Sequence, residues 1–125
     1  MKTKQLYLIF AFVAVSIIAV LYGISPDWFA RSFLGVESLN NNLAHILRAI
    51  MGLYLAFGFF WCLSAFDDRL RSPAVLTTVF FSAGLVSGRL LSLAIDGKPS
   101  ALLLFYMAIE FTLIPVAIYI YKLPD

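Results

Sequence analysis

The sequence predicts an all-α integral membrane protein, an up-down-up-down four-helix bundle with a short amphipathic helix in its first outer loop. The composition is 62% hydrophobic and 13% charged, with a mean hydropathy of +0.95, far outside the range of soluble domains. Four long apolar runs lie at about residues 6–24, 43–66, 74–95 and 101–121. Each is close to the roughly 20 residues that cross about 30 Å of hydrocarbon. We therefore expect one membrane domain over residues 1–125.

The first apolar run is expected to be a membrane helix. Lys2 and Lys4 precede it, as in a secretory signal, but the run exceeds the usual core of about 7–15 residues and lacks a small-x-small cleavage site. Residues 9–15 are apolar at every position, whereas strands of membrane barrels alternate apolar and polar residues. The run is therefore interpreted as a span.

The loop at residues 25–42 is predicted to contain a short helix. Ser25, Pro26 and Asp27 supply a capping hydroxyl, a proline at the first helical position and an acid in the first turn, and Gly35 is a suitable stop. Its apolar side would consist of Trp28, Phe29, Phe33 and Leu34. Such a helix suits the outer headgroup region, as an interfacial anchor or as a lid over the bundle, and the anchor is favoured.

The remaining connections are short, so neighbouring spans should be antiparallel. Residues 67–73 form a charged inner turn, and Asp96-Gly97-Lys98-Pro99 combines Asp-Gly turn chemistry with a proline before the last helix. Within the spans, small residues recur at a spacing of four, which predicts close helix contacts. These small residues are Gly84, Gly88 and Ser92 in the third span, and Gly52 and Ala56 in the second.

The distribution of Lys and Arg predicts the orientation, because positive residues are retained on the cytoplasmic side. With the N-terminus inside, the cytoplasmic residues are Lys2, Lys4, Arg69, Arg71 and Lys122, against Arg31 and Lys98 outside. We therefore expect a multi-pass protein of the inner (plasma) membrane with both termini cytoplasmic. This topology accounts for the basic residues, so the net charge of +2 predicts no nucleic-acid partner.

Three charged residues interrupt the spans: Arg48, Arg89 and Glu110. At about 1.5 Å per residue they lie roughly 8, 10 and 15 Å below the outer ends of their helices, all in the outer half. Charges in hydrocarbon are costly and need partners. We therefore expect the three to converge inside the bundle, with the arginines holding the Glu110 carboxylate ionised.

Helical spacing adds polar neighbours to these charges. Asn41, His45, Arg48 and Gly52 share one face of the second span, and Ser82, Arg89, Ser92 and Asp96 share one face of the third. Tyr106 is one turn from Glu110. Both polar faces should point into the bundle. The candidate site, either a ligand-binding cluster or a structural charge cluster, comprises Arg48, Arg89, Glu110, Asp96, His45, Ser92 and Tyr106.

Three parts of the chain resemble a known family. They are the run Arg48-Ala49-Ile50-Met51-Gly52-Leu53-Tyr54, the run Gly88-Arg89-Leu90-Leu91-Ser92 followed by Asp96-Gly97-Lys98-Pro99-Ser100, and Glu110 in the final span. The pattern resembles domain-of-unknown-function family 4345, small four-helix bacterial membrane proteins. The resemblance covers nearly the whole chain. It implies a fold and a location, lends no activity, and suggests that Arg48, Arg89, Asp96 and Glu110 belong together.

The sequence disfavours most enzyme chemistries, so an enzyme is the weakest class. Quinone-linked thiol oxidoreductases need paired cysteines, and Cys62 is alone. Haem and metal sites need several ligands, and His45 is the single histidine, better explained as a polar residue near a helix end. Hydrolase and phosphate-loop signatures are missing. We therefore expect no metal and no cofactor.

Two functions and one structural interpretation stay open. The cluster is either a pocket in which guanidinium groups hold the head of an amphipathic or lipid-like molecule, or the site of a small proton-coupled transporter that uses Glu110. Otherwise it is an internal ion-pair network that fixes helix register. Membrane lipids are the expected partners. Self-association and docking onto a larger membrane complex are further alternatives.

Overall fold

The computed structural model describes residues 2–36 and 40–124 and contains five helices there. They are α1 (Thr3–Gly23), α2 (Pro26–Phe33), α3 (Asn41–Ala65), α4 (Arg71–Asp96) and α5 (Ala101–Lys122). The four long helices begin and end within one turn of the predicted spans. The predicted all-α fold, with four helices long and apolar enough to be spans and a short helix in the first loop, is confirmed.

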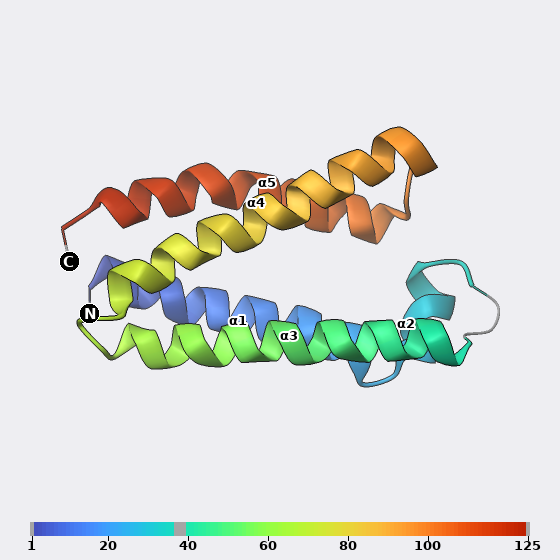
Figure 1. The fold of residues 1–125 in the computed structure, drawn as a ribbon, viewed down its shortest axis with the longest axis horizontal. Helices are drawn as coiled ribbons and strands as arrows, with labels where there is room; N and C mark the ends of the chain where they lie inside the picture. The colour runs from blue at the N-terminus through green and yellow to red at the C-terminus, as the bar shows by residue number, and fades with distance from the viewer. Residues whose placement is uncertain (1, 37–39, 125) are drawn as a thin grey trace.

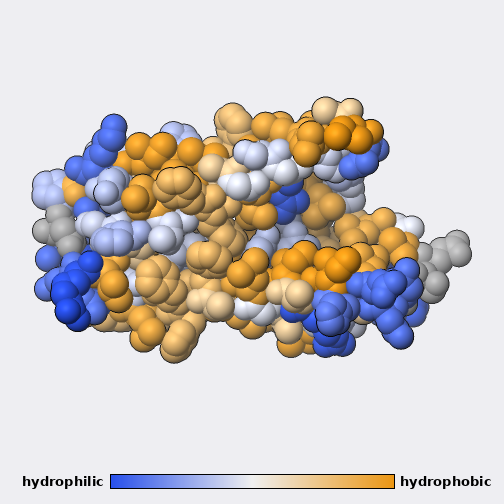
Figure 2. Space-filling model, viewed as in Figure 1, coloured by the Kyte–Doolittle hydropathy of each residue, from blue (hydrophilic) through white to orange (hydrophobic). Residues whose placement is uncertain are grey.

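All four long helices are long and apolar enough to cross a membrane. Large apolar side chains cover their outer surfaces; Phe80 is 71% exposed and Ile95 is 72% exposed. Figure 2 shows these hydrophobic residues over the middle of the molecule and hydrophilic residues at its two ends. In water such a surface would be unstable. It is the surface expected of a multi-pass membrane protein, whose outer face contacts lipid.

The bundle consists of two helix pairs (Figure 1). Helix α1 packs along α3, and α4 packs along α5, whereas the contacts between the two pairs are fewer. The two termini lie at the same end of the bundle, as an even number of spans requires. At the other end, where α2 lies, the two pairs diverge. The candidate site described below lies between the two pairs.

Close contact between α1 and α3 depends on glycines that the spacing pattern did not single out. A Cβ atom on Gly58 would lie 2.9 Å from Cγ1 of Val15, and one on Gly23 would overlap Met51. By contrast, Gly52, Gly84 and Gly88 are exposed, and no described atom lies within 4 Å of the position of a Cβ at any of them. The prediction that these three glycines mediate contacts within the bundle is wrong.

The short helix α2 forms as predicted, and one aromatic side chain fixes it to the bundle. Phe29 is fully buried, with its ring 4.9 Å from that of Tyr22. Trp28 is half exposed, which suits a residue at the membrane interface. Ser25 occupies the N-cap but makes no capping hydrogen bond, and Gly35 follows the helix with a φ of 71°, a left-handed stop that glycine adopts without strain.

The end of the bundle that carries the termini is held by two buried cations. Lys4 donates a hydrogen bond of 2.7 Å to Ser72 and thereby joins α1 to α4. Arg71 donates to the Ala65 carbonyl at 3.2 Å and pairs with Asp68 at 2.8 Å. The turn between α3 and α4 was predicted to be only a charged loop, but Arg71 is 5% exposed and is part of the packed end of the bundle.

Candidate functional site

A buried ion pair joins α4 to α5. Arg89 Nε lies 2.9 Å from Glu110 Oε2, and Arg89 Nη2 lies 3.2 Å from Oε1. The two side chains are 19% and 12% exposed. This two-pronged arrangement is the strong form of a guanidinium–carboxylate pair. Nη2 also donates to the Tyr22 hydroxyl at 3.4 Å, so the pair reaches α1 and connects the two halves of the bundle.

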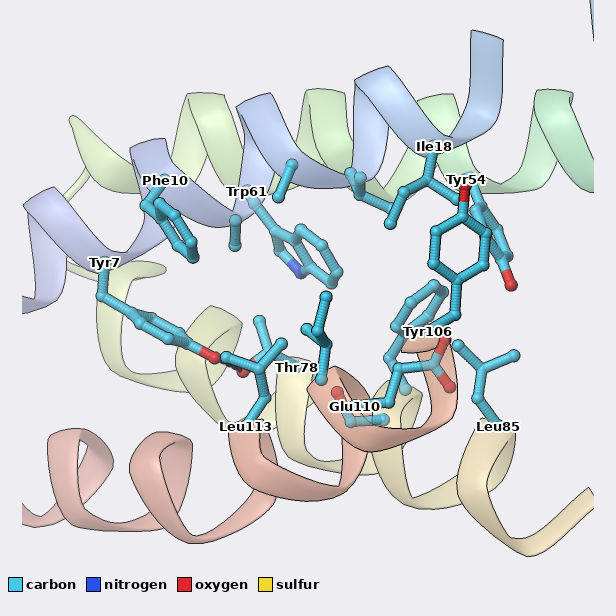
Figure 3. Close-up of a pocket in the computed structure, with 16 residues that line it drawn as sticks. Tyr7, Phe10, Ile18, Tyr54, Trp61, Thr78, Leu85, Tyr106, Glu110 and Leu113 are labelled. Carbon is cyan, nitrogen blue, oxygen red and sulfur yellow. Dashed lines mark hydrogen bonds between the residues drawn. The ribbon is translucent and has the colours of Figure 1, made fainter. Parts of the chain in front are cut away.

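A cavity of about 200 Å³ adjoins this pair and lies between α1, α3, α4 and α5. Glu110, Tyr106 and Tyr54 line one end, and Tyr7 and Phe10 line the other (Figure 3). Almost all the remaining wall is aliphatic or aromatic. The volume is several times the roughly 30 Å³ that one liquid water occupies, and an apolar cavity does not hold water well. An apolar chain or ring is the better occupant.

The cavity reaches the molecular surface between α1 and α5. Phe10 of α1 and Ile109 of α5 line the cavity, yet they are 61% and 38% exposed. These two helices contact one another little. The opening therefore lies on the apolar outer surface of the bundle, the surface expected to contact lipid.

The hydroxyl groups of Tyr7, Thr78 and Tyr106 lie along the cavity and differ in whether they have hydrogen-bond partners. At one end, Thr78 donates to the Val75 carbonyl at 2.6 Å, so Tyr7 must donate to Thr78, 2.9 Å away. At the other end, Tyr106 is 5% exposed and none of the described residues hydrogen-bonds its hydroxyl. A buried polar group without a partner is uncommon and costly. Tyr106 is therefore the one of the three with an unused hydrogen-bonding group.

Arg48 does not join the expected cluster. It lies on the exposed side of α3, and its Nη1 donates to the Gly23 carbonyl at 3.2 Å. A cation at the C-terminus of a helix is favourable, because the last carbonyls lack partners and carry partial negative charge. His45 is also exposed and lies on the same outward face. The prediction that this face of α3 points into the bundle is wrong; Leu47 and Tyr54 point inward instead.

Ser92 and Asp96 lie near the end of α4 and are exposed. The Ser92 hydroxyl donates to Asp96 at 2.8 Å, and Asp96 forms no ion pair with Arg89. Ser92 and Arg89 border a small groove of about 90 Å³ between α4 and α5. Glu110 lines the large cavity and Arg89 lines this groove, so the ion pair separates the two spaces. In the described chain, no three His, Cys, Asp or Glu residues are grouped as metal ligands would be.

The chain matches the family model described as Domain of unknown function (DUF4345) over residues 3–121, a segment that covers all of the helices except the last residue of α5. The chain belongs to this family. The resemblance seen in the sequence is thus confirmed. No curated protein and no solved structure matches the chain. The function of this DUF4345 protein must therefore be inferred from its own geometry.

Sequence reasoning missed the tyrosines that complete the site in this DUF4345 protein. The Tyr22 ring is in edge contact with Tyr54 and Tyr106, at centroid distances of 5.9 and 6.1 Å, and its hydroxyl accepts from Arg89. Tyr7 lines the far end of the cavity. The available signal was the presence of two tyrosines, Tyr7 and Tyr22, in a first span that was interpreted only as an apolar membrane helix.

Proposed function

We propose that this DUF4345 protein binds an amphipathic, lipid-like small molecule that reaches its site from the membrane. The observation that carries the proposal is the apolar cavity, with the Arg89–Glu110 pair and the Tyr106 hydroxyl at one end and an opening between α1 and α5. Apolar walls with a few well-placed polar groups are typical of small-molecule sites. The location of the opening favours a ligand dissolved in the bilayer.

The alternative functions have less support. A proton-coupled transporter would need to protonate Glu110 in every cycle, yet this carboxylate is held by two donors of one guanidinium. A purely structural ion pair would explain how α4 is joined to α5, but it would not explain the adjoining cavity or the unpartnered Tyr106 hydroxyl. The site offers no nucleophile paired with a general base, which most enzyme mechanisms of acyl transfer require.

Filling the cavity tests the binding proposal. Ala14 lines the cavity, and its neighbour Val13 is 48% exposed and does not line it. We expect native mass spectrometry of the protein purified from its own membranes to detect a retained amphiphile. Ala14→Phe should reduce the occupancy about tenfold or more, a loss of about 1.4 kcal/mol, because the new ring occupies the space of the ligand. Val13→Phe should leave it unchanged. If mass spectrometry detects only bulk membrane lipids, and in equal proportion for the wild type, Ala14→Phe and Val13→Phe, the proposal is contradicted.

We further propose that the protein lies in the inner (plasma) membrane with both termini cytoplasmic, which agrees with the two termini lying at one end of the bundle. In a Cys62→Ala background, a cysteine at exposed Asn42 should react with an impermeant maleimide in intact cells, whereas one at exposed Pro124 should react only after lysis. Labelling of Pro124→Cys but not Asn42→Cys in intact cells would reverse the topology.

A further inference from the structure

We infer that the ligand carries an uncharged head with a hydroxyl or carbonyl oxygen, and that this oxygen hydrogen-bonds Tyr106 while the apolar body fills the cavity. The inference rests on the proposed binding function and narrows it to one chemical class. It is drawn from the charge balance of the site, from the unused hydroxyl of Tyr106 and from the way polar groups are distributed along the cavity.

The charge balance of the site disfavours ionic heads. Glu110 is the single formally charged residue among the described residues that line the cavity, and Arg89 already neutralises it. Glu110 lines the cavity and Arg89 does not, so an anionic head would lie on the carboxylate side of the pair without a free cation to balance it, and burying an unpaired charge is costly. A cationic head would have to displace Arg89 from a two-pronged pair. An uncharged head meets neither obstacle, and its transfer from the membrane costs less than that of an ion.

Sequence reasoning predicted two guanidinium groups for an anionic or polar head, and the structure leaves neither of them free for this task. Arg48 donates to the Gly23 carbonyl outside the cavity. Arg89 directs Nε and Nη2 to Glu110, and Nη2 is shared with Tyr22. Arg48 therefore carries its charge outside the cavity, and the charge of Arg89 is balanced by Glu110, so neither guanidinium offers a positive charge to a head inside the cavity.

The position of Tyr106 sets the orientation of the ligand. Its hydroxyl is buried and unpartnered among the described residues, and Figure 3 shows Tyr106 at the Glu110 end of the cavity. At the opposite end the hydroxyls of Tyr7 and Thr78 satisfy one another. A ligand oxygen would remove the penalty of the unpaired Tyr106 hydroxyl. We therefore place the head near Tyr106 and the apolar tail toward Tyr7 and Phe10.

Trp61 lines the cavity and provides a reporter for the test. In a Trp28→Phe background, it is the single tryptophan left in the chain. Bromine quenches tryptophan fluorescence at short range, so quenching by an ω-bromododecyl chain measures occupancy. The probes are the alcohol, the carboxylate and the trimethylammonium derivative of this chain, added to the protein in nanodiscs. Affinities are compared per mole fraction of probe in the bilayer, so that differences in membrane partitioning cancel.

The alcohol should bind about tenfold more tightly than either ionic probe. Tyr106→Phe, which removes one hydroxyl, should weaken the binding of the alcohol about three- to tenfold, as expected for one neutral hydrogen bond. The affinity for the ionic probes should be unchanged. Tyr119 is on the same helix and 67% exposed, so Tyr119→Phe is the matched control and should change nothing.

The outcomes separate the two proposals. If Ala14→Phe abolishes quenching but the carboxylate or ammonium probe binds as tightly as the alcohol, the uncharged head is refuted and binding stands. The same holds if Tyr106→Phe has no effect on the alcohol. If Ala14→Phe fails to reduce quenching by any probe, the cavity is not the site, and both the proposed function and this inference are refuted.

Discussion

Replacement of Glu110 by glutamine is expected to lower the free energy of unfolding by about 3–5 kcal/mol, the usual cost of breaking a buried ion pair by removing one partner. The Arg89 guanidinium loses the charge that compensates it; the amide oxygen of glutamine is an uncharged, weaker acceptor, and the Tyr22 hydroxyl accepts from Nη2 only at 3.4 Å. The loss will be smaller if Arg89 turns toward the groove that it borders with Ser92 and reaches the headgroup region. Thermal unfolding in detergent measures the effect.

A double-mutant cycle shows whether the pair is the cause. Arg89→Gln alone should also be strongly destabilising, whereas the double variant should be about as stable as the better single variant, because no uncompensated charge is left. Asp96→Asn is the control, since Asp96 is exposed and, among the described residues, bonded only to Ser92 on the same helix; its effect should stay within about 0.5 kcal/mol.

Infrared spectroscopy provides an independent check on Glu110. We expect the antisymmetric stretch of an ionised carboxylate near neutral pH, and we expect Glu110→Gln to remove it. Small additive effects in the cycle, together with the band of a protonated carboxyl group, would contradict the ion pair. Those results would instead favour proton-coupled transport through Glu110.

Gly58→Ala should lower the free energy of unfolding by about 1–3 kcal/mol, because it overpacks the interface between α1 and α3. The added Cβ would lie 2.9 Å from Val15 Cγ1 and 3.2 Å from Ser16 Oγ. Val15 is 5% exposed but lines the cavity, so a rotation of its side chain into the cavity would relieve its own contact and leave the one with Ser16. Full relief of the overlap would require α1 and α3 to move apart, and this separation would weaken the packing between the two helices.

Gly84→Ala is the matched control for this prediction. Gly84 lies within α4, and no described atom lies within 4 Å of the position of its Cβ. The substitution should be neutral, or stabilising by up to about 1 kcal/mol, because alanine has the higher helix propensity. Detergent unfolding of both variants tests the difference. Should Gly84→Ala prove the more harmful, Gly84 would lie at an interface with another molecule, and the four-residue spacing of small residues would mark that interface.

The amino-acid sequence was sufficient to predict the membrane class, the number and order of the spans, and their ends to within one turn. These properties depend on local signals: the length of each apolar run, the charged and Pro-Gly connections, and the Ser25-Pro26-Asp27 start and Gly35 stop of α2. Apolar length is decisive because hydrocarbon offers no partner to backbone polar groups, so each run that crosses it must be helical. The depths of Arg89 and Glu110, estimated from the helical rise, likewise placed them where they can pair.

The face of each helix that points inward could not be predicted from the sequence and is known from the packed structure. In a soluble protein the apolar face of a helix points to the core. In a membrane, the lipid and the protein core are equally apolar, so an apolar face no longer shows which side of a helix points inward. Polar residues were a poor substitute. Arg48 donates a hydrogen bond to a carbonyl at the end of α1, and the face of α3 that it shares with His45 points outward. The cavity is lined by residues of α1, α3, α4 and α5 that are far apart in the chain, so it depends on how each of these helices is rotated in the packed bundle.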